Sequence, residues 1–297
     1  MMTFPKPPSD LLQPAPLNIR TCFRTGNSAP VARRSRLQLF PAHAEATDAI
    51  NRDRVWPIPR DAEETAQEAR AAVQRAWADG IKRQRVELLL PLIGATDLDD
   101  WPGGVRQQFK AVLPMVESML TGLKAVDGLQ GALNGEIWDQ GDAVGAWQGK
   151  AMNVVVFPTG EVVKRMIQIE EKQPQSLLLM VNPQWGLSRQ VVSDFGFFGR
   201  KKAEEFLARF EDTYFLKSYT IAGDGIRVLR SYPGDWQIHL VNEETGENTL
   251  VCSTPERPSY QLLKETIEKV EGSNSSKPLA DRIRREIQFN QDSLSGK

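Results

Sequence analysis

Two aspartates three residues apart are the first candidates for chemistry in this chain. Asp139 and Asp142 stand at the two ends of a polar, glycine-containing turn. Two carboxylates at this spacing can bind a metal ion or act as a general acid and base. In a turn they can also accept hydrogen bonds from nearby backbone N–H groups. We favour this second, structural role and keep both residues as candidates for a ligand-binding cleft.

The other candidate cleft residues follow two short apolar runs that have the length of buried strands: Thr159, Asn182, Gln184 and Trp185. The two amides can hydrogen-bond a ligand, and Trp185 can stack on one. Thr159 precedes a predicted helix, whose N-terminus can receive a phosphate. The structural alternative packs Trp185 in the core and uses Asn182 to cap a turn.

These residues share one feature, which is their position just after a predicted strand. In an open α/β sheet, ligands bind beyond the carboxyl ends of the parallel strands. A third strand exit is expected at Pro91–Thr96. If the strands are parallel, the three exits line one edge of the sheet, and the sequence therefore predicts a shared cleft there.

Several familiar catalytic patterns are missing from the sequence. Neither GxGxxG nor GxxxxGK[ST] occurs, which excludes a standard nucleotide-binding loop. After residue 46 the chain has one histidine, His239, and one cysteine, Cys252, which excludes a zinc site built from these ligands. We expect His239 to be a satisfied histidine within a strand and Cys252 to be a small buried residue. No catalytic residue, metal or cofactor is predicted, and we favour a protein that is not an enzyme.

The elements that must position the candidates alternate between helices and apolar strands. Asp61 and Glu64 form a capping box that begins the first helix, and a second helix is expected at 105–123 with a kink or break at Pro114. Strands are expected at 81–90, 153–157 and 177–181. A strand, helix, strand order implies a right-handed crossover. The predicted fold is α/β, with three layers and a Rossmann-like, mainly parallel sheet between flanking helices.

The pattern changes after residue 212 to short strands separated by Gly, Pro and Asp turns, which is typical of an antiparallel meander. Its four strands are expected at Thr213–Ile221, Ile226–Tyr232, Trp236–Asn242 and Thr249–Ser253. The sequence leaves open whether this meander extends the main sheet or forms its own layer. We predict a single α/β domain over residues 55–270, followed by a flexible linker and amphipathic tail over 271–297.

Residues 1–46 have the composition of a targeting segment. They contain six basic and two acidic residues, many prolines, and no continuous apolar stretch. This composition predicts a disordered plastid transit peptide, and the alternative is a plain disordered N-terminus. The net charge of −1 over 297 residues offers no basic field for nucleic acid. No run of 18 apolar residues is present that could cross a membrane as a helix.

Taken together, the segments KRQRVELLLP, WDQGDAVGAW, VVVFPTGE and LLLMVNPQW resemble a domain of unknown function found in plastid and cyanobacterial proteins. That family includes the low photosystem II accumulation proteins, and a similar domain is appended to some chloroplast adenylate kinases. The resemblance covers residues 55–270. It implies a chloroplast protein of the stroma or the thylakoid surface. The family has no agreed catalytic residues, so none is carried over.

The leader and the resemblance lead to one expected function. We expect a soluble plastid accessory protein that supports assembly of a photosystem, such as photosystem II, or of another thylakoid complex through protein–protein contacts. Peripheral attachment to the thylakoid is left open. The alternative is a small-molecule or nucleotide-binding enzyme that uses the carboxyl edge of the sheet.

Overall fold

The computed structural model describes residues 54–91, 104–185, 197–242, 245–271 and 273–276, with only the backbone for 197–200. The predicted leader, most of the strand exit at 91–96 and residues 277–297 of the predicted tail lie outside the described residues. The helical segments are α2 (Ala62–Ala78), α3 (Val105–Leu123), the 3-10 turn η1 (Gly160–Val162), α4 (Val163–Lys172), α6 (Phe197–Leu207) and α7 (Tyr260–Ile267). The strands are β1 (Arg83–Glu87), β2 (Asn134–Asp139), β3 (Val144–Gln148), β4 (Met152–Val156), β5 (Leu177–Val181), β6 (Glu211–Ile221), β7 (Asp224–Ser231), β8 (Trp236–Val241) and β9 (Asn248–Thr254).

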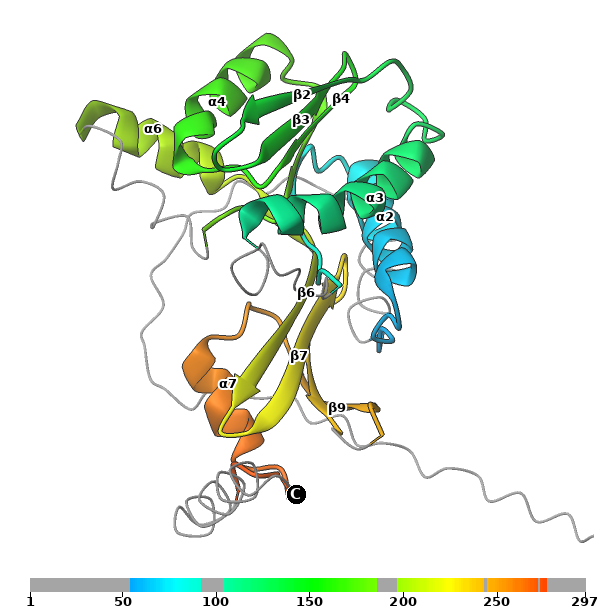
Figure 1. Cartoon of the computed structure of the whole chain (residues 1–297), viewed down its shortest axis with the longest axis vertical. Coiled ribbons are helices and arrows are strands. Elements are labelled where there is room, and N and C mark those ends of the chain that lie inside the picture. Colours follow the sequence, from blue (N-terminus) through cyan, green and yellow to red (C-terminus); the bar gives the residue numbers. More distant parts are fainter. Residues whose placement is uncertain (1–53, 92–103, 186–196, 243–244, 272, 277–297) are drawn as a thin grey trace, which may run out of the picture.

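All nine of these strands form one sheet in the order β2-β3-β4-β5-β1-β6-β7-β8-β9 (Figure 1). Strands β4, β5, β1 and β6 are parallel to one another. The five other neighbouring pairs are antiparallel. The expectation of a mainly parallel sheet is therefore wrong, and the sheet is mixed. The β2–β3 hairpin adds antiparallel strands at one end, and the meander extends the same sheet at the other.

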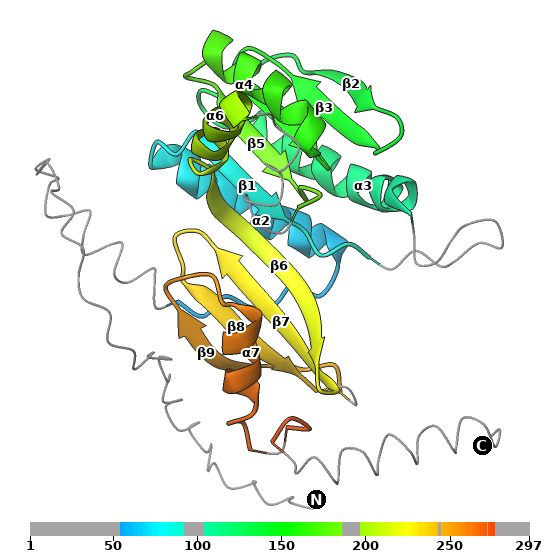
Figure 2. The ribbon, with the colours of Figure 1, turned by 90° about the vertical axis from the view of Figure 1, so that its left-hand side faces the viewer.

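Helices cover both faces of the parallel strands, as expected (Figure 2). Val154 and Leu179 point to the face that carries α2 and α3, where they join the largest apolar cluster. Their neighbours Val155 and Leu178 point to the opposite face and pack against α4 and α6. This alternation follows from the two-residue period of a strand. Because both faces of β4 and β5 are covered, the two strands are apolar throughout.

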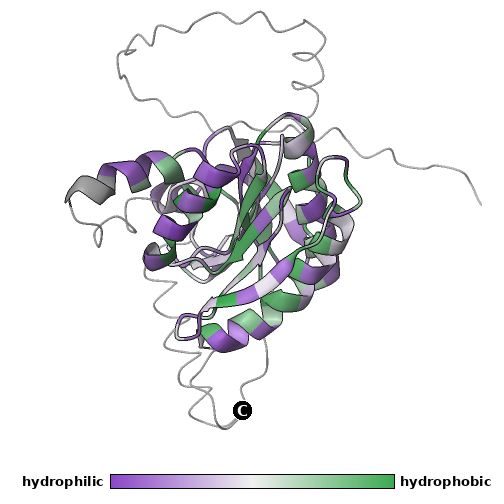
Figure 3. Cartoon of the chain, turned by 90° about the horizontal axis from the view of Figure 1, so that it is seen from above, coloured by the Kyte–Doolittle hydropathy of each residue, from purple (hydrophilic) through white to green (hydrophobic). Residues whose placement is uncertain are grey.

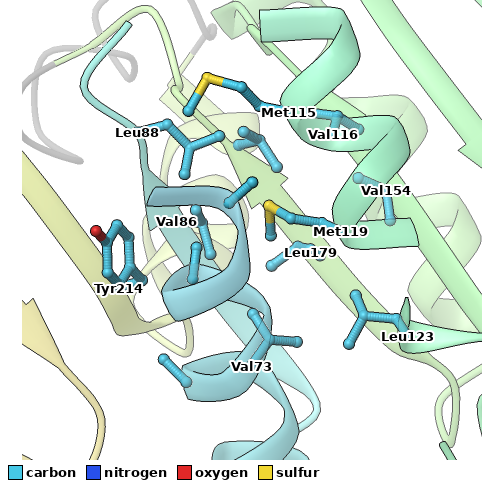
Figure 4. Close-up of a cluster of buried hydrophobic side chains, with 14 of the residues drawn as sticks. Val73, Val86, Leu88, Met115, Val116, Met119, Leu123, Val154, Leu179 and Tyr214 are labelled. Carbon is cyan, nitrogen blue, oxygen red and sulfur yellow. The ribbon is translucent and has the colours of Figure 1, made fainter. Parts of the chain in front are cut away.

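The largest cluster lies between the sheet and the pair of helices α2 and α3 (Figure 4). Val86 of β1 lies near its centre, with Met119 and Leu123 of α3 on one side and Tyr214 of β6 on the other. Figure 3 shows apolar residues gathered on the sheet between the helices and polar residues on the outer helix faces. Burial of one such large side chain contributes about 1.5–3 kcal/mol, so this cluster stabilises the junction of β1 with its neighbours.

The predicted start of α2 is confirmed. Asp61 Oδ1 accepts a hydrogen bond from the backbone N–H of Glu64 at 2.8 Å. In return, the Glu64 carboxylate accepts a hydrogen bond from the backbone N–H of Arg60 at 2.9 Å. In a standard capping box the donor is the backbone N–H of the N-cap residue, which here is Asp61. Helix α3 continues through Pro114, so the proline does not end it.

The four predicted meander strands are confirmed, and α7 packs against them. The β6–β7 turn consists of Ala222 and Gly223, both with positive φ. Two-residue hairpin loops commonly have this conformation, because its twist matches the right-handed twist of the two strands. Asp224, just after this turn, accepts hydrogen bonds from the backbone N–H groups of Asn274 at 2.8 Å and Ser275 at 2.7 Å. Residues 273–276, which the sequence assigned to the linker, are thus bound to β7.

The first described residues are joined to the far end of the sheet. Gln237 of β8 accepts a hydrogen bond from the backbone N–H of Trp56 at 3.1 Å and donates one to the carbonyl of Arg54 at 2.7 Å. The Trp56 ring, 4% exposed, lies between the guanidinium groups of Arg54 and Arg75, at 4.3 and 4.5 Å from the ring centre. This segment therefore belongs to the folded unit, although it contains no helix or strand.

Candidate functional site

Asp139 and Asp142 lie in the β2–β3 turn. Asp139 Oδ1 accepts hydrogen bonds from the backbone N–H groups of Gly141 at 2.7 Å and Asp142 at 3.0 Å. The side chain of Asp142 is exposed, and its backbone carbonyl accepts a hydrogen bond from Gln184 at 2.7 Å. One of the two carboxylates is thus engaged by its own turn, which is the structural role that the sequence offered as the alternative to chemistry.

Asn182 joins the end of β5 to the end of β1. It has a positive φ of 47°, a conformation that asparagine adopts more easily than most residues. Its Oδ1 accepts a hydrogen bond from the backbone N–H of Leu88 at 2.7 Å, and its Nδ2 donates one to the carbonyl of Leu88 at 2.9 Å. The amide side chain therefore imitates a strand partner and continues the β1–β5 pairing by one residue.

Gln184 and Trp185 leave β5 in different directions. The Gln184 side chain is exposed at the surface, and its Nε2 donates to the carbonyl of Phe157 at 3.0 Å as well as to that of Asp142. Trp185 is 8% exposed and packs in the cluster beneath α4 and α6. Gln184 thus connects the exits of β4 and β5 with the β2–β3 turn, while Trp185 has no face open for a ligand to stack on.

Thr159 precedes η1, but its hydroxyl makes no capping hydrogen bond. The hydroxyl oxygen is buried and has no partner among the described residues. The Thr159 carbonyl accepts a hydrogen bond from the backbone N–H of Val162 at 3.3 Å. The structure therefore brings Asp142, Gln184 and the β4 exit together at the expected edge, where Gln184 Nε2 joins them through backbone carbonyl groups.

A row of charged side chains on β1 was not predicted from the sequence. Arg83, Arg85 and Glu87 alternate along the strand and share the face that carries α4 and α7. In the segment RQRVE, charged residues recur at every second position, which indicates a charged face on a strand. From the sequence, this segment was predicted only to begin an apolar strand. A central strand with buried charges on one face needs partners for each of them.

The two arginines of this row are paired. Arg83 Nε lies 2.6 Å from Glu170 of α4, and the same carboxylate also pairs with Arg209. Two guanidinium nitrogens of Arg85, Nε and Nη2, contact the carboxylate of Asp212, at the start of β6. These bonds fix α4 and β6 to the middle of the sheet, because a buried charge is costly without its partner.

Glu87, at the carboxyl end of β1, is the least satisfied member of the row. It is 1% exposed; Oε2 lies 3.1 Å from Lys217 Nζ, and Oε1 is buried without a hydrogen bond from the described residues. Burial raises the pKa of Glu87, and the positive charges of Lys217, Arg85 and Arg257 only partly oppose this shift. A carboxyl group with a perturbed pKa at this edge of the sheet is a candidate functional group.

Aromatic rings and arginines extend from Glu87 toward α7. The Arg257 guanidinium lies 4.6 Å from the ring centre of Phe215, which packs edge-to-face on Trp236 with ring centres 5.0 Å apart. Tyr219 is half-buried, and its burial raises its pKa, while Arg257 opposes the shift. The surroundings of Glu87 are therefore both apolar and cationic.

His239 and Cys252 lie in the predicted meander strands, but His239 is not the fully hydrogen-bonded histidine that the sequence predicted. Cys252 is buried in the cluster under α7. His239 is 3% exposed in β8, and its Nε2 lies 3.4 Å from the oxygen of Gln237, while Nδ1 is buried without a partner among the described residues. Burial lowers the pKa of His239 to about 4, and the neighbouring charge of Arg227 adds to the effect. The histidine is thus neutral near pH 7.

Within the described ranges, no group of three or more His, Cys, Asp or Glu side chains is arranged to hold a metal ion. In the same ranges, no helix has the length and apolar character needed to cross a membrane. The Glu87 cluster and the residues around Gln184 are therefore the polar features that the structure offers at the carboxyl edge.

Residues 59–265 match the model of a protein family described as a domain of unknown function, DUF1995. No curated protein and no solved structure matches the chain.

Proposed function

The chain belongs to this DUF1995 family, and from that membership we propose that it is a plastid accessory protein which supports assembly of a photosystem or another thylakoid complex by binding other proteins. The plastid location is supported by the arginine-containing, acid-poor composition of residues 1–46. The binding role is supported by a feature of the sheet, its exposed edge at β2.

Strand β2 is the outermost strand at one end of the sheet and pairs only with β3 among the described strands (Figure 2). Its residues Asn134–Ile137 are exposed, and Ile137 is 51% exposed. Lysine and proline, which commonly protect sheet edges, are both missing from β2. A free strand edge offers backbone donors and acceptors to an extended segment of another protein.

The β2 edge is also attached to helix α4, which favours binding by strand addition. Arg165 of α4 lies over the Trp138 ring at 4.1 Å and pairs with Glu136, which accepts further hydrogen bonds from Trp138 and Gln148. These contacts hold one face of β2 against α4 and leave Ile137 on the other face. A partner strand would therefore meet an edge that is already in its bound shape.

The test is affinity purification of the tagged protein from isolated plastids, with mass spectrometry of the captured proteins. The expected result is enrichment of photosystem or thylakoid assembly proteins. Ile137→Lys places a charge on the β2 edge and should remove them, whereas Thr249→Lys, at an exposed position of the opposite edge strand β9, should not. A wild-type protein that captures no plastid protein above the control would refute the proposal.

The second candidate function is a small-molecule or nucleotide-binding enzyme that uses the carboxyl edge. The observation that favours it is Glu87, because titratable groups with perturbed pKa values gather at catalytic sites. A thermal-shift screen with plastid metabolites tests this candidate. A stabilising metabolite that no longer acts on Glu87→Gln would support it, and a screen without any stabilising compound would count against it.

A further inference from the structure

A groove of about 640 Å³ lies at the amino end of β4, on the opposite edge of the sheet from Glu87. It is bounded by the segment before β2, the β3–β4 turn and the C-terminal end of α4. Its most unusual property is the number of amide side chains that line it: Gln130, Asn134, Gln148, Asn153 and Gln173. Its volume falls within the range of small-molecule sites.

Three of these amides form a row across neighbouring strands. Asn134 of β2 is in register with Gln148 of β3, which is in register with Asn153 of β4. Residues in register on adjacent strands point to the same face of a sheet. The row is therefore a consequence of strand pairing and is held in place by the backbone.

Asn153 is the buried member of this row, and hydrogen bonds hold its side chain in place. It is 1% exposed, and its Nδ2 donates to Gln173 Oε1 at 2.8 Å and to Ser176 Oγ at 3.2 Å. These two bonds set the orientation of the amide, and its Oδ1 accepts no hydrogen bond from any described residue. An amide oxygen that accepts no hydrogen bond from the described residues, in the wall of a groove, is a natural partner for a hydroxyl group of a ligand.

Two lysines supply all the formal charge of the groove lining. Lys150 lies in the β3–β4 turn and Lys172 in the last turn of α4, and neither forms an ion pair with a described residue. No acidic side chain lines the groove. The last carbonyl groups of α4 end nearby and can accept hydrogen bonds from hydroxyls, while their partial negative charge opposes the anionic group, which the two lysines must attract.

From this combination we propose that the groove binds a small anion that carries several hydroxyl groups, of the sugar-phosphate class. The lysines contact the anionic group. The hydroxyls bind the amide atoms that make no hydrogen bond with described residues, among them Asn153 Oδ1 as acceptor and Gln173 Nε2 as donor. No aromatic side chain lines the groove, so a nucleobase would find no ring on which to stack. The proposal concerns binding alone and is independent of the protein partners proposed above.

Isothermal titration calorimetry of the full chain with glucose 6-phosphate, ribose 5-phosphate and fructose 6-phosphate tests the proposal. At least one of the three should bind saturably, and glucose and inorganic phosphate should each bind at least about tenfold more weakly than the phosphorylated sugars. Loss of one charge-assisted contact predicts that Lys150→Met and Lys172→Met each weaken binding about tenfold or more.

Lys164→Met provides the matched control, because Lys164 is an exposed lysine of the same helix α4 that does not line the groove. It should bind as the wild type does, and the melting temperatures of all three variants should show that they remain folded. The proposal is overturned if none of the three compounds binds, if inorganic phosphate binds as tightly as they do, or if Lys164→Met weakens binding as much as the groove variants.

Discussion

His239 should make the protein lose stability in mild acid by a predictable amount. In the folded chain its pKa is lowered from the usual 6.5 to about 4, whereas the unfolded chain keeps the usual value. Above pH 6.5 the residue is neutral in both states and has no effect. As the pH falls below 6.5 the unfolded chain binds a proton that the folded chain does not, and stability declines until the pH reaches the folded pKa. At 1.36 kcal/mol per pH unit, the loss between pH 7 and pH 5 is about 2 kcal/mol.

The measurement compares the wild type with His239→Gln by urea unfolding at pH 7 and pH 5, followed by tryptophan fluorescence. Glutamine keeps a polar side chain but does not titrate. All other groups titrate alike in both proteins, so subtraction isolates the histidine. The free energy of unfolding of the variant should fall about 2 kcal/mol less than that of the wild type between the two pH values.

The structural reason for the low pKa can be refuted by the same experiment. Gln237 is oriented by two backbone groups so that its oxygen faces His239 Nε2, which must then carry the proton. Protonation of Nδ1 would place a charge beside Arg227 in a buried site. If both proteins lose equal stability on acidification, the histidine is protonated in the folded state and this account is wrong.

Three further predictions concern the carboxyl edge and the middle of the sheet. Asn182→Ala removes two hydrogen bonds to Leu88 and forces alanine into a positive φ. The free energy of unfolding in urea should therefore fall by about 3 kcal/mol. A fall below about 1 kcal/mol would contradict the role of Asn182 as a strand partner of Leu88. Glu170→Ala leaves Arg83 buried without its carboxylate and should cost about 3 kcal/mol in the same assay, and an unchanged stability would show that the carbonyl groups around Arg83 suffice. Glu87 has a raised pKa in the folded chain, so its contribution is complete below the unfolded pKa near 4.5 and is lost as the pH rises through the folded value. The stability of the wild type relative to Glu87→Gln should therefore fall between acidic and neutral pH, and a constant difference would show that folding does not shift the pKa of Glu87.

The parts of the fold that the sequence predicted are those with local signals. The meander strands are joined by short turns, and each pairs with its neighbour in the chain, so turn residues suffice to place them. The start of α2 was visible because Asp61 and its partner lie three residues apart. In contrast, β1 pairs with β5 and β6, which lie more than 90 residues away in the sequence. No local sequence pattern predicts which strands pair over such a distance.

The candidate site was predicted only in part for a related reason. The sequence identified the exits of β4 and β5, because apolar runs that end in polar residues are easy to see. It identified the turn that holds Asp139 but not β3, the strand that follows this turn and pairs with β2. The partners of Glu87 and the register that aligns Asn134, Gln148 and Asn153 arise only when distant strands meet.

The attachment of Arg54 and Trp56 to β8 limits how the chain can be processed. A cut within residues 1–46 would leave these contacts intact, because the contacts begin at Arg54. A cut after Trp56 would remove the backbone partners of Gln237 and empty the space between the helix α2 and the meander that the tryptophan ring occupies. A chain shortened from its N-terminus should therefore keep these contacts only if it begins at or before Arg54.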